Sequence, residues 1–239
     1  MRVANGVLLL MLSVVPWTAS GASPARPAAT ARAPAAEAAL PLVEVPATAG
    51  TSDTFVVFVS GDGGWAAIDK SMAAVFAARG MPVVGLNALQ YFWSKKSADV
   101  AGRDLRRIIE QYSARWQKKR VILVGYSRGA DVLPAMASRL SAEILSRVRL
   151  VALLGPSPKA QFEFHMSDWL HDPSGGEPVR PELERMRGTP VLCLWGEEDT
   201  DSLCRGLTMP NVRVVTLRGG HHFDGAYENL ARIVLEKIE

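Results

Sequence analysis

Short apolar or β-branched runs alternate with amphipathic stretches along most of this 239-residue chain. Such alternation predicts parallel strands joined by helices that cover both faces of one sheet. The fold class is therefore α/β, a doubly wound, mostly parallel sheet whose chemistry should lie at the carboxyl ends of its strands. Strands are expected at 41–46, 54–59, 82–87, 120–125, 149–154, 190–195 and 212–217, and helices at 68–79, 98–116, 128–146 and 224–238.

The N-terminal residues predict export. Arg2 precedes an apolar run at 7–15 and a small-residue cleavage site at 20–22, so residues 1–22 are expected to be a cleavable signal peptide. An uncleaved anchor is the rival, but the run is shorter than the roughly 20 residues that span a bilayer. Residues 23–39 are rich in Ala and Pro and are expected to form a linker. The domain is expected over 40–239.

Charge excludes one class of partner. The 27 basic and 24 acidic residues give a net charge of +3, and the basic residues are scattered along the chain. Nucleic-acid binding requires a clustered basic stripe, so no nucleic-acid partner is expected.

The strand at 120–125 leads directly into Gly125-Tyr126-Ser127-Arg128-Gly129, which leads directly into a helical stretch. A Gly-x-Ser-x-Gly string is weak evidence alone, but the strand-turn-helix setting is that of a nucleophile elbow. Ser127 is the expected nucleophile, and the fold is expected to be the α/β-hydrolase type. Pro134 lies inside the following helix and should kink it.

A serine nucleophile needs a base and an acid, which follow in the order Ser, acid, His in this fold. Asp199 lies on the loop after the strand at 190–195, and His221 on the loop after 212–217. The neighbours left open as alternatives are His222 for the base, and Asp201, Glu197 and Glu198 for the acid.

Acyl transfer also needs amides that stabilise an oxyanion. The expected donors are the N–H groups of Arg128, which follows the nucleophile, and of Asp62, in the glycine-rich loop after 54–59. That loop lacks the Lys-Ser/Thr of a P-loop, so it is not read as a phosphate cradle. No cofactor or metal ion is expected.

The only two cysteines, Cys193 and Cys204, bracket the loop that carries Asp199. Export permits a disulfide between them, with two free thiols as the alternative.

Several segments resemble the VirJ/AcvB virulence proteins of Gram-negative bacteria: Ser60–Trp65, Tyr91–Trp93, Gly125–Pro134, Phe162–His165 with Trp169, Leu194–Cys204 and Gly219–Tyr227. The resemblance implies a periplasmic α/β-hydrolase-like protein. For AcvB and its relatives it implies hydrolysis of aminoacyl-phosphatidylglycerol, releasing lysine or alanine. VirJ is associated with type IV secretion, and the length of this chain resembles the single-domain VirJ form more than the longer AcvB-type proteins.

The residues expected to contact such a lipid substrate are Trp65, Tyr91, Phe92, Trp93, Asp131 and His222. Lys95 and Lys96 follow the aromatic triplet and are expected to meet phosphate at an anionic inner-membrane surface, with core packing of the aromatics as the alternative. The expected function is a serine ester hydrolase of aminoacyl-phosphatidylglycerol. The alternatives are a general periplasmic esterase and a non-catalytic secretion module that binds type IV components.

Overall fold

The structure, a computed structural model, describes residues 39–164 and 175–238. The predicted signal peptide and nearly all of the predicted linker lie outside the described residues, as do His165 and Trp169. No helix among the described residues combines the length and the apolar character needed to cross a bilayer.

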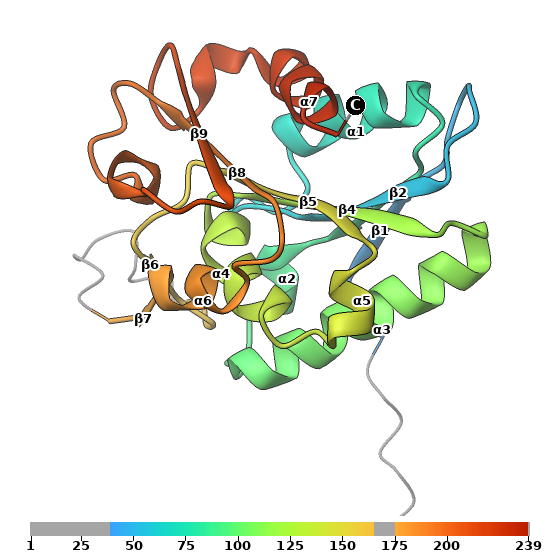
Figure 1. Ribbon diagram of the computed structural model, residues 1–239, viewed down its shortest axis with the longest axis horizontal. Coiled ribbons are helices and arrows are strands. Elements are labelled where there is room, and N and C mark those ends of the chain that lie inside the picture. The colour runs from blue at the N-terminus through green and yellow to red at the C-terminus, as the bar shows by residue number, and fades with distance from the viewer. Residues whose placement is uncertain (1–38, 165–174, 239) are drawn as a thin grey trace, which may run out of the picture. The chain divides into compact units, whose positions relative to one another are not determined.

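The main sheet has seven strands in the order β1-β3-β2-β4-β5-β8-β9 (Figure 1). Its strands are β1 (Leu42–Val45), β2 (Thr54–Val59), β3 (Val83–Leu86), β4 (Arg120–Tyr126), β5 (Val148–Leu154), β8 (Val191–Gly196) and β9 (Val212–Leu217). Only β1 runs antiparallel to its neighbour within this sheet. The expected α/β-hydrolase-type sheet is thus confirmed, and each predicted strand is present. A separate two-stranded sheet joins β6 (Lys159–Ala160) to β7 (Glu177–Pro178).

Helices cover both faces of the main sheet (Figure 1). They are α1 (Ala67–Ala78), α2 (Ala88–Tyr91), α3 (Ala98–Trp116), α4 (Arg128–Ala137), α5 (Ala142–Leu145), α6 (Arg180–Arg185) and α7 (Tyr227–Glu236), with 3₁₀ turns η2 (Leu203–Gly206) and η3 (Phe223–Gly225). Helices α1 and α7 pack together on one face, and α3 and α4 on the other. The central strands β2 and β4 are therefore buried on both sides, which explains their continuous apolar runs.

The expected helix at 128–146 is wrong in one respect, because the structure divides it. Helix α4 runs through Pro134 and ends at Ala137, and Ser138 Oγ donates back to the Ala135 carbonyl at 3.1 Å. Ser141 then caps α5 by accepting the Ile144 N–H at 3.3 Å. Serine side chains that bond to the backbone near helix ends favour such breaks.

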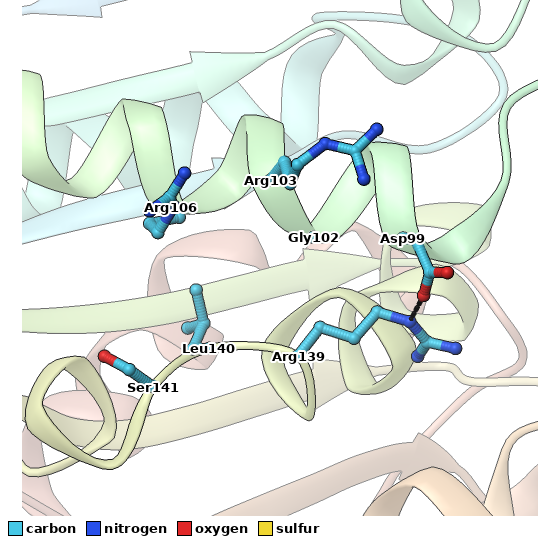
Figure 2. Close-up of a pocket in the computed structure, with 7 residues that line it drawn as sticks. All are labelled: Asp99, Gly102, Arg103, Arg106, Arg139, Leu140 and Ser141. Atoms are coloured by element: carbon cyan, nitrogen blue, oxygen red, sulfur yellow. Dashed lines mark hydrogen bonds and ion pairs between the residues drawn. The ribbon is translucent and has the colours of Figure 1, made fainter.

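A surface groove of about 440 Å³ lies between α3 and the residues that follow α4 (Figure 2). It contains Arg103 and Arg106 of α3, together with Arg139, whose Nε donates to Asp99 Oδ1 at 2.6 Å. The ion pair lies beyond the C-terminal end of α4, whereas the candidate site described below lies at the N-terminal end of the same helix.

Candidate active site

Ser127 occupies a strained turn between β4 and α4. Its φ of 53° and ψ of −123° are rare for a residue with a side chain, and such strain concentrates at functional sites. Two glycines make the turn possible. A Cβ on Gly129 would collide with the carbonyls of Val59 and Ser60, and a Cβ on Gly125 would collide with the backbone of Gly129. The glycines of the sequence motif are therefore required by close backbone approach.

Ser127, His221 and Asp199 form one chain of hydrogen bonds. Ser127 Oγ lies 2.9 Å from His221 Nε2, and His221 Nδ1 lies 2.8 Å from Asp199 Oδ2. A carboxylate at Nδ1 fixes the tautomer with the proton on that nitrogen, so Nε2 is left to accept the serine proton. The structure thus brings together, in the expected order, the three side chains that the sequence proposed as a triad.

The loops that carry Asp199 and His221 are joined through their backbones. Glu198 N–H donates across to the Gly219 carbonyl at 3.1 Å, and within the first loop Asp199 N–H donates to the Gly196 carbonyl at 2.9 Å. Gly155, at a φ of 60°, lies directly against the imidazole of His221. Sequence reasoning missed Gly155, although its position at the carboxyl end of β5 was a signal for it.

His222 does not join the triad. Its Nδ1 lies 2.7 Å from the hydroxyl of Tyr126, the residue before the nucleophile. The Tyr126 ring also lies 5.6 Å from the His221 ring. The structure joins His222 to the nucleophile turn, and its expected contact with substrate stays a prediction.

The expected oxyanion residues lie beside Ser127. A side chain on Gly61 would come within 3.3 Å of Ser127 Cβ, so the glycine-rich loop lies directly on the nucleophile turn. Gly64 N–H donates to the Gly61 carbonyl at 3.1 Å, which places Asp62 at the tip of a tight turn. Arg128 is the first residue of α4, where the helix dipole favours negative charge.

Two of the aromatic residues that the sequence predicts as substrate contacts, Tyr91 and Phe92, lie in the core. Tyr91 and Phe92 are buried in the core, where the Tyr91 hydroxyl donates to Asp104 at 2.6 Å, and burial raises the pKa of Tyr91. Trp65 packs edge-on against Phe58 at 5.7 Å. For Tyr91 and Phe92 the structure therefore shows core packing, the alternative that the sequence left open, because an aromatic triplet at a strand end fits either environment. Trp65 is only partly buried, and its expected substrate contact stays a prediction.

Trp93 stays exposed, with 64% of its surface accessible. It stacks on Phe164, with ring centroids 5.8 Å apart and an interplanar angle of 19°. The Arg128 guanidinium lies 5.7 Å from the centre of the same Phe164 ring. The one exposed large hydrophobic side chain among the described residues is thus connected to the nucleophile turn.

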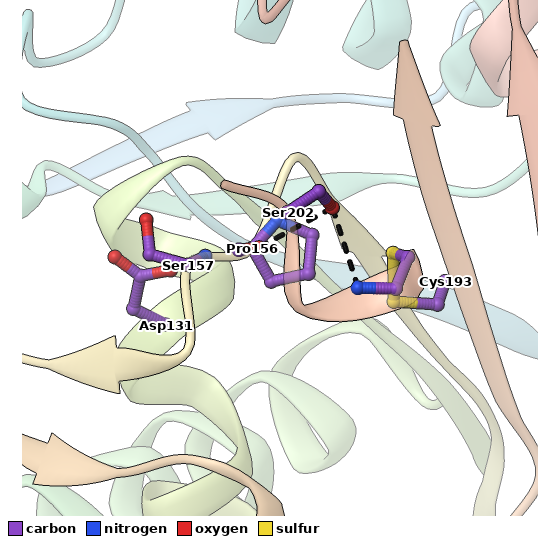
Figure 3. Close-up of a disulfide and its surroundings, with 6 residues drawn as sticks. Asp131, Pro156, Ser157, Cys193 and Ser202 are labelled. Carbon is purple, nitrogen blue, oxygen red and sulfur yellow. Dashed lines mark hydrogen bonds between the residues drawn. A yellow bond between two sulfur atoms is a disulfide. The ribbon is translucent and has the colours of Figure 1, made fainter. Parts of the chain in front are cut away.

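Asp131 supports the strand-end loop after β5. Its Oδ1 accepts the Ser157 N–H at 2.6 Å, and burial raises the pKa of its carboxyl group well above the usual range (Figure 3). The carbonyl of Pro156, the residue before Ser157, accepts the Leu203 N–H at 2.8 Å. Leu203 begins the 3₁₀ turn that contains Cys204. The sequence predicts that Asp131 receives the substrate ammonium. In the structure, one of its two carboxyl oxygens already accepts a backbone N–H.

Cys193 and Cys204 form the expected disulfide, with Cα atoms 5.6 Å apart (Figure 3). It joins β8 to η2 and closes the loop that contains Asp199. Within residues 39–164 and 175–238, no three His, Cys, Asp or Glu side chains gather in a way that suits a metal ion.

The family comparison matches most of this domain. A family model described as "Bacterial virulence protein (VirJ)" matches residues 53–239. The chain belongs to the VirJ family. The family range begins just before β2 and includes all of the triad, which confirms the resemblance seen in the sequence. No curated protein matches the chain.

Solved structures share the fold of this VirJ-family chain. Proline iminopeptidase from Mycobacterium smegmatis has a TM-score of 0.61 at 13% identity, covering 82% of this chain and 93% of that one. MenH from S. aureus has a TM-score of 0.58 at 15% identity, covering 82% and 97%. Est1E from Butyrivibrio proteoclasticus has a TM-score of 0.56 at 13% identity, covering 82% and 93%. At such low identity the likeness shows the α/β-hydrolase fold alone.

Proposed function

We propose that this VirJ-family chain is a serine hydrolase that cleaves the aminoacyl ester of aminoacyl-phosphatidylglycerol. The observation that carries the hydrolase assignment is the continuous chain of hydrogen bonds from Ser127 Oγ through His221 to Asp199. An ordinary surface serine has no such base, and a hydroxyl without one is a poor nucleophile.

In the proposed reaction Ser127 Oγ attacks the ester carbonyl while His221 Nε2 takes the serine proton. His221 then gives that proton to the departing glycerol oxygen, and an aminoacyl-enzyme remains. Water then attacks this intermediate while His221 takes one of its protons. His221 returns that proton to Ser127 Oγ as the acyl–oxygen bond breaks, which releases the free amino acid and restores the enzyme. Asp199 stays ionised throughout and stabilises the imidazolium.

The choice of a lipid substrate is supported by the family and by the surface near Ser127. The stacked Trp93 and Phe164 offer apolar area at the site, and exposed Lys95 lies two residues after Trp93. Exposed aromatic and basic side chains suit an interface with anionic phospholipid. Exposed Glu197, on the loop that carries Asp199, offers negative charge for the substrate ammonium.

Export to the periplasm is part of the same proposal. It rests on the N-terminal signal pattern and on the disulfide between Cys193 and Cys204, which is compatible with an oxidising compartment. We propose that the protein contacts the inner membrane only peripherally.

The test uses purified protein with lysyl- and alanyl-phosphatidylglycerol in mixed micelles. We expect release of free amino acid, weaker turnover of an N-acetylated analogue, and no release of fatty acid. Ser127→Ala should stay folded and lose several orders of magnitude in turnover, because only the oxyanion and binding contributions remain.

Three other outcomes would change the assignment. Near wild-type turnover by Ser127→Ala would remove the triad hypothesis. Good turnover of simple acyl esters without attack on the aminoacyl lipid would indicate a general periplasmic esterase. Absence of both activities, together with recovery of secretion components in a pull-down, would favour the binding module.

A further inference from the structure

The two residues expected to supply the oxyanion N–H groups are also joined by their own side chains. The Arg128 guanidinium forms an ion pair with the Asp62 carboxylate through Nε and Oδ1. Arg128 has only 8% of its side chain exposed, whereas Asp62 has 37%. The pair thus connects the start of α4 with the glycine-rich loop.

Arg128 also contacts the segment after β6. Its Nη1 donates to the carbonyls of Gln161 at 3.2 Å and Glu163 at 3.0 Å, and its guanidinium lies over the Phe164 ring. A guanidinium is a planar fork with several donors, so one side chain can hold several acceptors in a fixed relation. Arg128 is therefore fixed independently of Asp62.

The glycine-rich loop is closed at its base and has open space around Gly63 at its tip. The base of the turn is closed by the Gly64 N–H bond to the Gly61 carbonyl. At the tip, within the part of the chain that the structure describes, a side chain on Gly63 would meet nothing but its chain neighbours. The Asp62 carboxylate attaches this tip to Arg128.

We propose that the Arg128–Asp62 ion pair is a positioning device that sets the separation of the two oxyanion donors. The proposal rests on the proposed hydrolase function. When the carboxylate is held, the Asp62 amide keeps a fixed distance from the Arg128 amide across Ser127. Preorganised donors lower the barrier because they need no reorganisation as the oxyanion forms. Moving a donor by about 1 Å from its productive position can lower the rate about 100-fold.

The test centres on Asp62, because Arg128→Ala removes a mostly buried side chain and endangers folding. Asp62→Ala removes the contact, while Asp62→Asn keeps an oxygen that can accept from Arg128. Asp99→Ala is the matched control, since it breaks an Arg–Asp pair of the same kind at the other end of α4 (Figure 2).

Kinetics are measured with a neutral soluble ester, so that no substrate ammonium is involved. We expect Asp62→Ala to lower kcat by roughly 10- to 100-fold with KM changed by about twofold or less. The rate of covalent labelling by an alkyl fluorophosphonate, whose phosphoryl oxygen occupies the oxyanion position, should fall in parallel. Asp62→Asn should recover most of the loss, and Asp99→Ala should match the wild type.

Hydrogen exchange gives a readout that needs no turnover. Amides of residues 61–65 should exchange faster in Asp62→Ala than in the wild type or in Asp99→Ala. A rise in KM alone would make Asp62 a substrate contact and overturn the proposal, as would unchanged kcat and unchanged exchange. If the wild type neither turns over esters nor reacts with the fluorophosphonate, the hydrolase function fails, and the exchange comparison still decides whether the ion pair holds the loop.

Discussion

The hydroxyl of Tyr126 lies 2.7 Å from Nδ1 of His222, which joins the residue before the nucleophile to the residue after the base. Burial raises the pKa of Tyr126, so its hydroxyl stays protonated beside the imidazole. The two side chains that flank Ser127 therefore point to different loops. Tyr126 is attached to the histidine loop, and Arg128 to the glycine-rich loop.

This arrangement predicts a ranking of the two histidines. His221→Ala should remove nearly all turnover, because it deletes the base that contacts Ser127 Oγ. His222→Ala and Tyr126→Phe should each lower kcat by roughly tenfold or less, since each removes only one bond that orients the loop. Steady-state kinetics on a soluble ester give the comparison. The reverse ranking of the histidine variants would transfer the base role to His222.

The disulfide predicts a coupled loss of stability and activity. Replacing both Cys193 and Cys204 by Ala should lower the free energy of unfolding by up to about 3 kcal/mol, because the bridge closes a short loop. It should also lower kcat, since Asp199 lies inside that loop. Urea titration and steady-state kinetics of the double variant provide the measurement. Two alkylatable thiols in protein purified from the periplasm would contradict the bridge.

Variants at Asp131 distinguish two roles for this residue, support of the loop after β5 and binding of the substrate. Asp131→Asn keeps an oxygen for the Ser157 N–H, whereas Asp131→Ala loses it. If Asp131 supports the loop that holds Gly155 against His221, Ala should lower kcat by about tenfold or more and Asn should be mild. If the carboxylate instead binds the substrate ammonium, Asn should raise KM for the aminoacyl lipid and not for its N-acetylated analogue. Paired kinetics on the two substrates decide between the roles.

Asp69 predicts a dependence of stability on pH. It is buried, its Oδ2 accepts the Ala66 N–H at 2.8 Å, and burial raises its pKa from 3.8 to about 6. The folded state therefore holds this proton more tightly than the unfolded state does. The resulting stabilisation is fully present below about pH 4 and is lost as the pH rises through 6.

The measurement compares urea unfolding of the wild type and Asp69→Asn across this range. The stability of the wild type relative to the variant should fall by up to about 3 kcal/mol between pH 4 and pH 7, since a shift of one pKa unit is worth about 1.4 kcal/mol. Parallel curves for the two proteins would show that Asp69 does not titrate in this way.

The sequence alone determined the α/β class, the strands and the order of the triad. Periodicity reports burial on one or both faces, and parallel strands must present their carboxyl ends at one edge. Ser127, Asp199 and His221 each follow a predicted strand, so their meeting was a consequence of the topology. The strained turn at Ser127 could be inferred because only glycine at 125 and 129 permits the close approach that it needs.

Tertiary structure decided which of two compatible environments each remaining side chain occupies. The triplet at 91–93 suits a core or a surface, and packing between α3 and the sheet buried Tyr91 and Phe92 while it left Trp93 exposed. The partnership of Arg128 with Asp62 joins residues that are 66 positions apart. A sequence pattern shows how apolar residues recur along a strand or helix and which residues favour a turn, and both concern residues that are close in the chain. Contacts between distant loops depend on how the sheet edge brings them together, so they appear only when the chain is folded.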